Sequence, residues 1–184
     1  LKNFNIKKIY SFEPNPLIFK ELKKKIISNK IKMFNIGLSN KKENKILNIF
    51  FDTASSTINQ IDKKSSYYKR KKKIFSPGYN EVKFKKIKIF TNTLSNIMKS
   101  EKINKVDILK IDTEGYELKV LKGIIKKDFK KIKFIYFEHH YDLMIKKLYK
   151  YSEIDNLLKK NKFKKKFKIK MSFRKTFEYI YEKK

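Results

Sequence analysis

Residues 106–123 read VDILKIDTEGYELKVLKG, and this stretch decides the fold of the chain. The apolar run VDILKI predicts a strand, and YELKVLKG predicts a helix. Between them lies the acidic turn Asp112-Thr113-Glu114-Gly115. A strand, a turn and a helix in so short a stretch form half of a βαβ unit. In open α/β sheets, ligands bind at the carboxyl ends of the strands. We therefore expect Asp112 and Glu114 to lie where the chain carries out its chemistry.

The segments before residue 38 predict a strand, a helix and a second strand. Residues 6–12 (IKKIYSF) predict the first strand, which the turn Glu13-Pro14-Asn15-Pro16 ends because proline cannot donate to the ladder. Pro16 suits the first turn of a helix that is capped by Asn15 and continues to about residue 29. Residues 31–36 predict the second strand, and Gly37 closes it.

A β-rich insert at about 46–91 separates this opening from the central stretch. Residues 46–51 (ILNIFF) and the alternating residues 81–91 predict two strands. The charged residues 62–73 show no period, and we expect them to form a loop. Thr93 is placed to cap the short helix LSNIMKS, which leads into the central stretch.

Strands and helices continue to alternate after Gly123. Residues 132–138 (IKFIYFE) predict a strand, and Ser152 is placed to cap a helix. Residues 163–171 and 176–182 predict two final strands that form an antiparallel pair. This order predicts an α/β fold, with an open and mostly parallel sheet that ends in a mixed edge. We expect one domain over residues 1–184.

The net charge of +31 is the strongest feature of the composition. A basic surface attracts nucleic acid, anionic membranes or acidic glycans. Arginine, the usual residue for bidentate contacts with bases and phosphates, occurs only at positions 70 and 174, which leaves 49 − 2 = 47 lysines. Lysine, isoleucine, asparagine, phenylalanine and tyrosine are all residues written with A/T-rich codons. We interpret the charge as compositional bias with loose attraction for anions, and we expect no specific nucleic-acid partner.

The sequence contains no run of 18 apolar residues and does not open with the pattern of a signal peptide. We therefore expect a cytoplasmic protein without a membrane span. The absence of cysteine excludes disulfides and zinc–thiolate sites.

Glu13 lies where a strand meets a helix, and a carboxylate at this place can accept both hydroxyls of a cofactor ribose. In dinucleotide-binding folds, such a residue follows a glycine-rich loop by about 20 residues. Only 12 residues precede Glu13, and the four glycines at 37, 78, 115 and 123 form no G-x-G-x-x-G motif. Either the loop never existed, or the first strand and its glycine turn are missing from this sequence. Alternatively, Glu13 has only a structural role, as an acidic residue that stabilises the N-terminus of the following helix.

Four motifs in order resemble the FkbM-type S-adenosylmethionine-dependent methyltransferases. The central stretch VDILKIDTEGYELKVLKG resembles the most distinctive signature of that family. The segments IYSFEPNP at 9–16, NIGLS at 35–39 and FEHHY at 137–141 resemble its second strand with the ribose-binding turn, the segment after its third strand and the end of its fifth strand. The chain departs from the family by lacking the first strand and its glycine loop, and we interpret it as N-terminally truncated.

The resemblance implies a class I methyltransferase fold, a Rossmann-like mixed sheet with strand order 3-2-1-4-5-7-6 and an antiparallel strand 7. It also implies S-adenosylmethionine as cofactor and O-methylation, with a sugar hydroxyl of a polysaccharide or glycoconjugate as the expected acceptor. Glu13 takes the ribose, Gly37, Leu38 and Ser39 lie near the adenine, and Asn15 belongs to the same cofactor set.

Methyl transfer from a sulfonium is an in-line displacement, and a sugar hydroxyl must also lose a proton to a base. The candidate catalytic residues are Asp112 and Glu138, at the ends of neighbouring strands, and His139. Because neighbouring side chains of a strand point to opposite faces, at most one of His139 and His140 enters the site. Lys110 has the parity of Asp112 and is placed to pair with it. Asp112, Glu138 and a histidine would suit Mg²⁺, but their spacing carries no metal signature, and we predict no metal.

Two other functions remain as alternatives. One is a nicotinamide-dependent oxidoreductase on a similar sheet. The other is a binding module that binds RNA or an anionic glycan through residues 63–73 and 159–170.

Ser55-Ser56-Thr57 would be a loop over the acceptor, or an ordinary turn. If the first strand is missing, residues 1–184 should bind S-adenosylmethionine poorly, whereas the complete protein should bind it. The sequence leaves the acceptor and the oligomeric state open.

Overall fold

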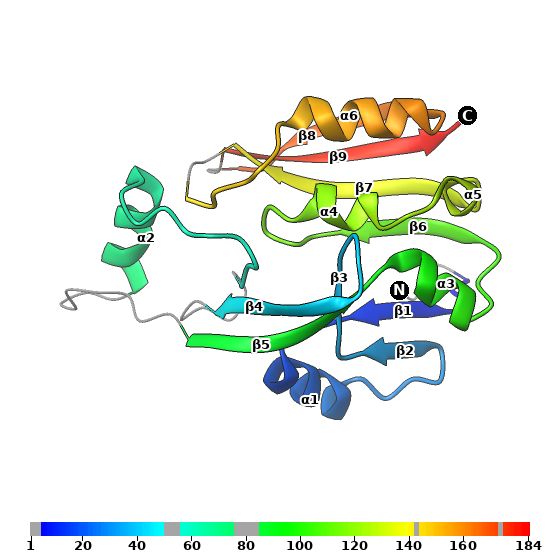
Figure 1. The fold of residues 1–184 in the computed structure, drawn as a ribbon, viewed down its shortest axis with the longest axis horizontal. Coiled ribbons are helices and arrows are strands. Elements are labelled where there is room, and N and C mark those ends of the chain that lie inside the picture. The colour runs from blue at the N-terminus through cyan, green and yellow to red at the C-terminus, as the bar shows by residue number, and fades with distance from the viewer. Residues whose placement is uncertain (1–4, 50–55, 76–84, 142–143, 173–174) are drawn as a thin grey trace.

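The computed structural model describes residues 5–49, 56–75, 85–141, 144–172 and 175–184 (Figure 1). Its helices are α1 (Pro16–Lys25), α2 (Ser66–Phe75), α3 (Leu94–Ser100), α4 (Glu117–Lys122), α5 (Lys126–Phe129) and α6 (Tyr151–Lys160). Its strands are β1 (Ile9–Phe12), β2 (Ile31–Phe34), β3 (Gly37–Leu38), β4 (Glu43–Ile49), β5 (Lys85–Asn92), β6 (Val106–Ile111), β7 (Ile132–His140), β8 (Phe163–Lys170) and β9 (Thr176–Lys183).

The strands form three sheets instead of the single sheet expected from the sequence. β1 pairs with β2 in parallel, β3-β5-β4 form a second sheet, and β6-β7-β9-β8 form a third. In the third sheet β6 and β7 are parallel, and β9 is antiparallel to both of its neighbours. The order of this third sheet agrees with the 4-5-7-6 part of the expected order, whereas no strand joins it to β1-β2 within the described residues. β1, β2, β6 and β7 all run in the same direction (Figure 1).

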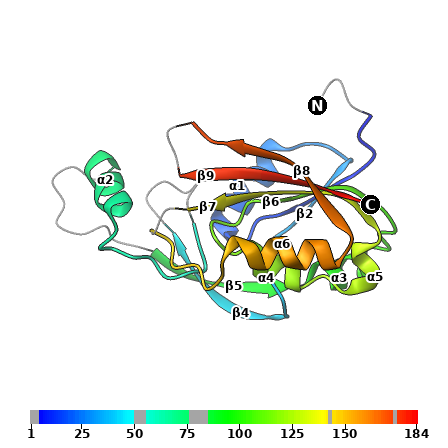
Figure 2. The same cartoon turned by 90° about the horizontal axis from the view of Figure 1, so that it is seen from above.

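The core lies between the third sheet and the helices on one of its faces. α3, α4, α5 and α6 are arranged along this face (Figure 2). Alternate residues of a strand share a face, and most of those of β6, β7 and β9 that point to the helices are aliphatic or aromatic. The buried side chains of this core include Leu109, Ile111, Ile135, Phe137, Tyr179 and Tyr181 from the strands and Leu118, Leu121, Ile154 and Leu158 from the helices.

Local sequence signals explain where two helices begin. Asn15 Oδ1 accepts the N–H of Leu17 at 3.1 Å, and Thr93 Oγ1 accepts the N–H of Asn96 at 3.1 Å. Both are the side-chain caps expected from the sequence, and they satisfy backbone donors that the first helical turn leaves without partners.

Three features differ from the expectations. α2 begins inside the stretch 62–73 that was expected to be a loop and continues to Phe75, because lysine is a good helix former and Tyr68 of this helix packs against Met144 and Ile145. α6 begins at Tyr151, so Ser152 is not its cap, and the N–H of Lys150 instead donates to Glu153 Oε1 at 2.9 Å. The short helix α5 was not expected.

Some expected features lie outside the described residues. These are the end of the strand predicted at 46–51, the start of the strand predicted at 81–91, and Ser55. Within the described part of the chain, no helix is long and apolar enough to cross a membrane.

Candidate active site

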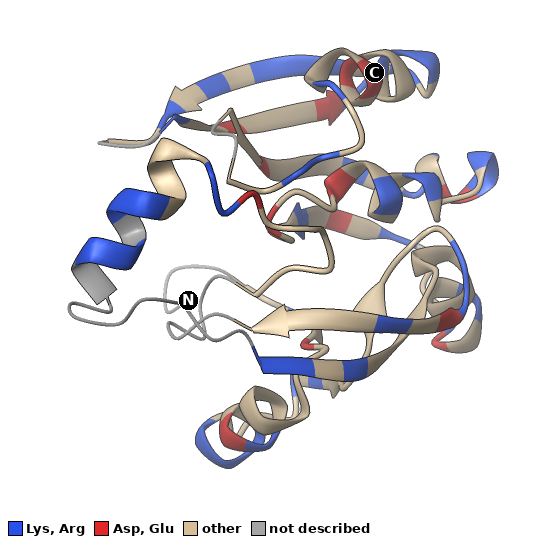
Figure 3. Ribbon diagram, turned by 60° about the vertical axis from the view of Figure 1, so that its left-hand side comes forward, with Lys and Arg blue, Asp and Glu red and all other residues tan. Residues whose placement is uncertain are grey.

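A cavity of about 740 Å³ lies between β1 and β6, at the carboxyl ends of these strands. Four carboxylate residues line it, Glu13, Asp112, Glu114 and Glu138, whereas Lys110 is its one lysine among the described residues. This composition is unusual in a chain with 49 basic and 18 acidic residues. Some red acidic segments lie in the middle of the ribbon, and others lie on its outer helices and strands among many blue segments (Figure 3). The cavity therefore concentrates negative charge in a strongly basic protein.

Glu13 is held in the turn that follows β1. Its Oε1 accepts the N–H of Asn15 at 2.7 Å. Burial raises the pKa of the Glu13 carboxyl, and the hydrogen bond from Asn15 partly opposes this shift. Asn35 Nδ2 donates to the backbone oxygens of Glu13 at 2.8 Å and Pro14 at 3.3 Å, which ties the turn to the end of β2. The turn is therefore fixed from both sides with its carboxylate toward the cavity.

The other predicted cofactor residues separate into two groups. Gly37 and Leu38 line the cavity together with Glu13. Asn15 is buried as the cap of α1, and Ser39 is fully buried with its Oγ 3.1 Å from the hydroxyl of Tyr116. Neither Asn15 nor Ser39 lines the cavity, so their side chains hold the surrounding turns in place instead.

The turn after β6 has backbone angles that few residues adopt. Glu114 has φ 49° and Gly115 has φ 89°, both in the left-handed region. Glu117 Oε1 accepts the N–H of Gly115 at 2.9 Å and the hydroxyl of Thr113 at 3.1 Å. Glu117 is fully buried, and its other oxygen accepts the hydroxyl of Tyr149, whose pKa is raised by burial and by this carboxylate. One buried carboxylate thus fixes the shape of the turn.

Asp112 and Lys110 are neighbours, as the parity of the strand predicted. Lys110 Nζ lies 3.3 Å from Asp112 Oδ2, and both side chains are partly exposed to the cavity. Residues 57–59, which follow β4, form hydrogen bonds with the backbone of the turn after β6. Thr57 Oγ1 donates to the backbone oxygen of Glu114 at 2.8 Å, and Asn59 Nδ2 donates to that of Gly115 at 2.6 Å.

The end of β7 separates the two histidines onto opposite faces. His140 Nε2 lies 3.2 Å from Glu114 Oε2 and 3.4 Å from Glu138 Oε1, and Thr176 Oγ1 lies 3.2 Å from His140 Nδ1. His140 therefore connects the carboxylate of the turn with the carboxylate at the end of β7.

His139 occupies a different environment from the one expected. It is buried against the rings of Tyr141, Tyr149 and Tyr151, with ring centroids 4.7, 5.7 and 5.7 Å away. Burial lowers the pKa of His139 to about 4, and the nearby Lys147 and His140 add to the shift. The structure brings Asp112 and Glu138 to one cavity but does not bring His139 to them. Alternation along β7 puts His140, and not His139, on the face of Glu138, although neither histidine lines the cavity itself.

Sequence reasoning did not identify Glu117, Asn35 or Tyr116 as parts of the site. Glu117 carried a usable signal, because it shares the buried helix face of Val120 and Leu121 at spacings of three and four residues. A buried glutamate requires hydrogen-bond donors nearby. Asn35 and Tyr116 form hydrogen bonds with Glu13 and Ser39, which are distant in the sequence, so no local sequence pattern predicts these contacts.

The family model described as the methyltransferase FkbM domain matches residues 1–165. No curated protein and no solved structure matches the chain. The matched range contains every residue that lines the acidic cavity, from β1 through β7. On this evidence the chain belongs to the FkbM methyltransferase domain family.

Proposed function

We propose that this protein is an S-adenosylmethionine-dependent O-methyltransferase that acts on a sugar hydroxyl of a polysaccharide or glycoconjugate. The family supports methyltransferase activity in general. The observation that carries the proposal further is the acidic cavity at the carboxyl ends of β1, β6 and β7. Ligands bind at this end of open α/β sheets.

The residues of the cavity fit the proposed cofactor. S-adenosylmethionine supplies its methyl group from a sulfonium cation, and four carboxylate residues favour a cation at this place. Within the described residues, the carboxylate of Glu13 accepts one hydrogen bond, from Asn15 N–H. Its remaining acceptor positions suit the two hydroxyls of a ribose, and such bonds would offset the cost of burying the carboxylate.

The edges of β1 and β6 that face the cavity suggest that an additional strand lies between these two strands. Ile9 donates its N–H to the oxygen of Lys30, just before β2, at 2.7 Å, and Glu13 donates to Phe34 of β2 at 3.0 Å. By alternation, the amides of Tyr10 and Phe12 point to the other side of β1, toward the cavity. β6 pairs with β7, and its other edge also has no partner strand among the described residues. Both edges belong to strands that run in the same direction (Figure 1).

We further propose that one additional strand, supplied from outside residues 1–184, pairs in parallel with both β1 and β6. This strand would complete the order 3-2-1-4-5-7-6 across β2-β1 and β6-β7-β9-β8. The turn that follows it would reach the carboxyl end of the sheet, beside Glu13 and Asp112, where it could contact the cofactor with its backbone N–H groups.

The catalytic part of the proposal rests on Asp112, Glu138 and His140. An acceptor hydroxyl beside Asp112 and Glu138 would be oriented by hydrogen bonds to their carboxylates for in-line attack on the methyl group. Glu138 would take up its proton, and His140 at 3.4 Å would share that proton with the carboxylate. Thr176 and Glu114 hold the imidazole in place. His140 thus replaces His139 as the candidate histidine.

Calorimetric titration with S-adenosylmethionine tests the proposal and separates its two parts. The product of the complete reading frame should bind the cofactor, and residues 1–184 alone should bind it at least ten-fold more weakly. The absence of binding to the complete product would overturn the cofactor assignment. Equal affinities for the two proteins would instead overturn the additional strand.

A further inference from the structure

A second cavity, of about 500 Å³, lies on the other side of the turn after β6. Glu114 lines only the acidic cavity and Gly115 only the second one, whereas Ile58 and Tyr116 line both. The turn and these two side chains therefore form a shared wall. A ligand in the second cavity would lie next to a ligand in the acidic cavity.

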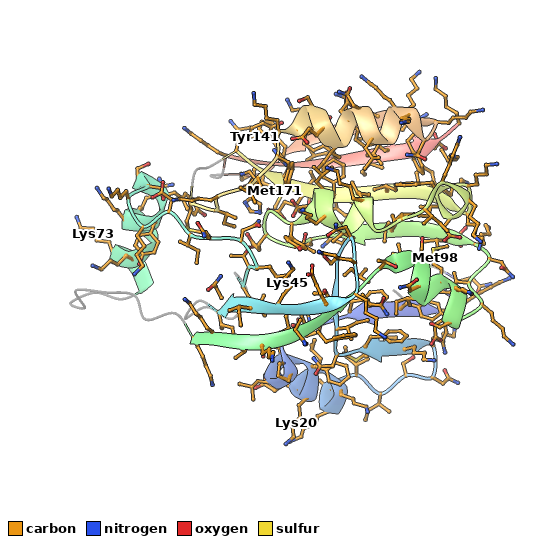
Figure 4. All side chains as sticks on the ribbon, viewed as in Figure 1. Lys20, Lys45, Lys73, Met98, Tyr141 and Met171 are labelled. Atoms are coloured by element: carbon orange, nitrogen blue, oxygen red, sulfur yellow. The ribbon has the colours of Figure 1, made fainter. Side chains whose placement is uncertain are left out.

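The second cavity has the opposite charge. Five lysines line it, and they come from three separate parts of the chain: Lys41 and Lys45, Lys119 and Lys122, and Lys146. Glu43 is its one acidic residue among the described residues, which gives a formal charge of 5 − 1 = +4. Figure 4 labels Lys45 beside β4 in the middle of the molecule, unlike Lys20 at the outer surface of α1.

The pairing of these lysines shows which of them are available to a ligand. Glu43 lies 2.9 Å from Lys45 Nζ and 3.6 Å from Lys41 Nζ, so one carboxylate holds both ammonium groups at the cavity. Lys119, Lys122 and Lys146 have no acidic partner in the part of the chain that the structure describes. Three ammonium groups thus line one cavity without an ion-pair partner among the described residues.

The number of lysines alone does not distinguish this cavity, because about a quarter of the chain is lysine. The contrast with the acidic cavity does distinguish it, because four carboxylate residues and only one lysine among the described residues line that neighbouring cavity. Uniform compositional bias would give both cavities the same sign. The shared wall therefore separates a compartment suited to a cation from one suited to an anion.

We propose that the second cavity binds the phosphate groups of a phosphorylated sugar while its hydroxyl lies in the acidic cavity. The link to methyl transfer rests on the proposed function, but the binding itself does not. Lysine binds phosphate as a point charge, whereas carboxylate recognition favours the planar fork of arginine. Gln60 offers an amide for sugar hydroxyls, and Leu148, which is 87% exposed, offers an apolar surface for the ring.

Titration with inorganic pyrophosphate tests this site without S-adenosylmethionine, so its result is independent of the cofactor assignment. The double variant Lys119→Gln/Lys122→Gln removes two positive charges from the cavity. Lys20→Gln/Lys24→Gln removes the same charge from the exposed surface of α1. Because all four side chains are exposed, thermal melting should show that both variants stay folded.

We expect pyrophosphate to bind the unaltered protein, the cavity variant to bind at least ten-fold more weakly, and the α1 variant to change affinity by less than about two-fold. Citrate, with a similar charge carried by carboxylates, should bind more weakly than pyrophosphate. Tighter binding of UDP-glucose than of glucose 1-phosphate would assign the site to a nucleotide-linked sugar, and the reverse order to a simple sugar phosphate. Equal losses in the two variants, equal binding of citrate, or no binding of pyrophosphate would overturn the proposal.

Discussion

Gly123 packs directly against the backbone carbonyl of Ser39, and a Cβ atom at position 123 would lie 2.1 Å from the Ser39 oxygen. The backbone of Gly123 has φ −81°, an angle that any residue adopts, so the glycine is needed for space and not for its conformation. This contact joins the last residue of the stretch VDILKIDTEGYELKVLKG to the segment NIGLS. The two motifs are therefore in direct contact beside the acidic cavity.

Substitution of Gly123 by alanine should destabilise the protein. The new methyl group overlaps a backbone oxygen, which cannot rotate away, so the chain must shift at a cost of about 1–3 kcal/mol. Urea denaturation measures the change in the free energy of unfolding. Gly37→Ala is the comparison, because its nearest contact is the side-chain atom Thr91 Cγ2 at 3.3 Å, and it should cost less. Equal costs would show that the approach of Gly123 to Ser39 does not constrain the fold.

Glu117→Ala should lower the free energy of unfolding by about 2–4 kcal/mol, because it leaves the N–H of Gly115 and the hydroxyl of Tyr149 buried without an acceptor. Tyr149→Phe removes only one of these donors and should cost about 1 kcal/mol. A double-mutant cycle on the two residues should give a coupling energy above about 0.5 kcal/mol. Strictly additive effects would rule out the proposed role of Glu117 as the common acceptor.

The burial of His139 predicts a pH dependence of stability. Its pKa falls from the ordinary 6.5 to about 4, so between these values the unfolded chain binds the proton more readily. The corresponding stability is fully present above pH 6.5 and is lost as the pH falls toward 4. Between pH 7.5 and pH 5 the loss amounts to about 2 kcal/mol.

The variant His139→Phe isolates this contribution, because the other titrating groups stay in place. The difference in unfolding free energy between the unaltered protein and the variant should change by about 2 kcal/mol over the same pH interval. Chemical denaturation at both pH values provides the measurement. A difference that does not vary with pH would mean that His139 titrates normally in the folded state.

The edges of β1 and β6 that have no partner strand among the described residues predict a pattern of amide exchange. The N–H groups of Tyr10 and Phe12 point to the cavity, whereas those of Ile9 and Glu13 are bonded to the backbone oxygens of Lys30 and Phe34. In residues 1–184, hydrogen exchange should be fast at Tyr10 and Phe12 and slower at Ile9 and Glu13. In the product of the complete reading frame, all four should be protected. Fast exchange at Tyr10 and Phe12 in both proteins would count against an additional strand.

The sequence predicts those features whose cause is local. The strand β6, its acidic turn and the following helix carry clear periodic patterns. The pairing of Lys110 with Asp112 follows from strand parity, and Thr93 is a side-chain cap within three residues of its partner. In each case the residues that interact lie close together in the chain.

Features that depend on distant residues were not predictable in the same way. Parity allowed at most one of His139 and His140 to enter the site, but only the positions of Tyr149 and Tyr151 show that His139 faces the aromatic side. The helix α2 is stabilised by Met144 and Ile145, more than 60 residues away in the chain. The hydrogen bond between Glu117 and Tyr149 likewise spans 32 residues.

The affinity of Glu13 variants for S-adenosylmethionine tests the central claim most directly, namely that the acidic cavity holds the ribose of this cofactor. Calorimetry on the complete protein should show that Glu13→Ala weakens binding by about 10- to 100-fold, since charge-assisted hydrogen bonds contribute about 1.5–3 kcal/mol. Glu21→Ala removes an exposed carboxylate from α1 and should leave the affinity unchanged. Equal dissociation constants for the Glu13 variant and the unaltered protein would contradict the claim.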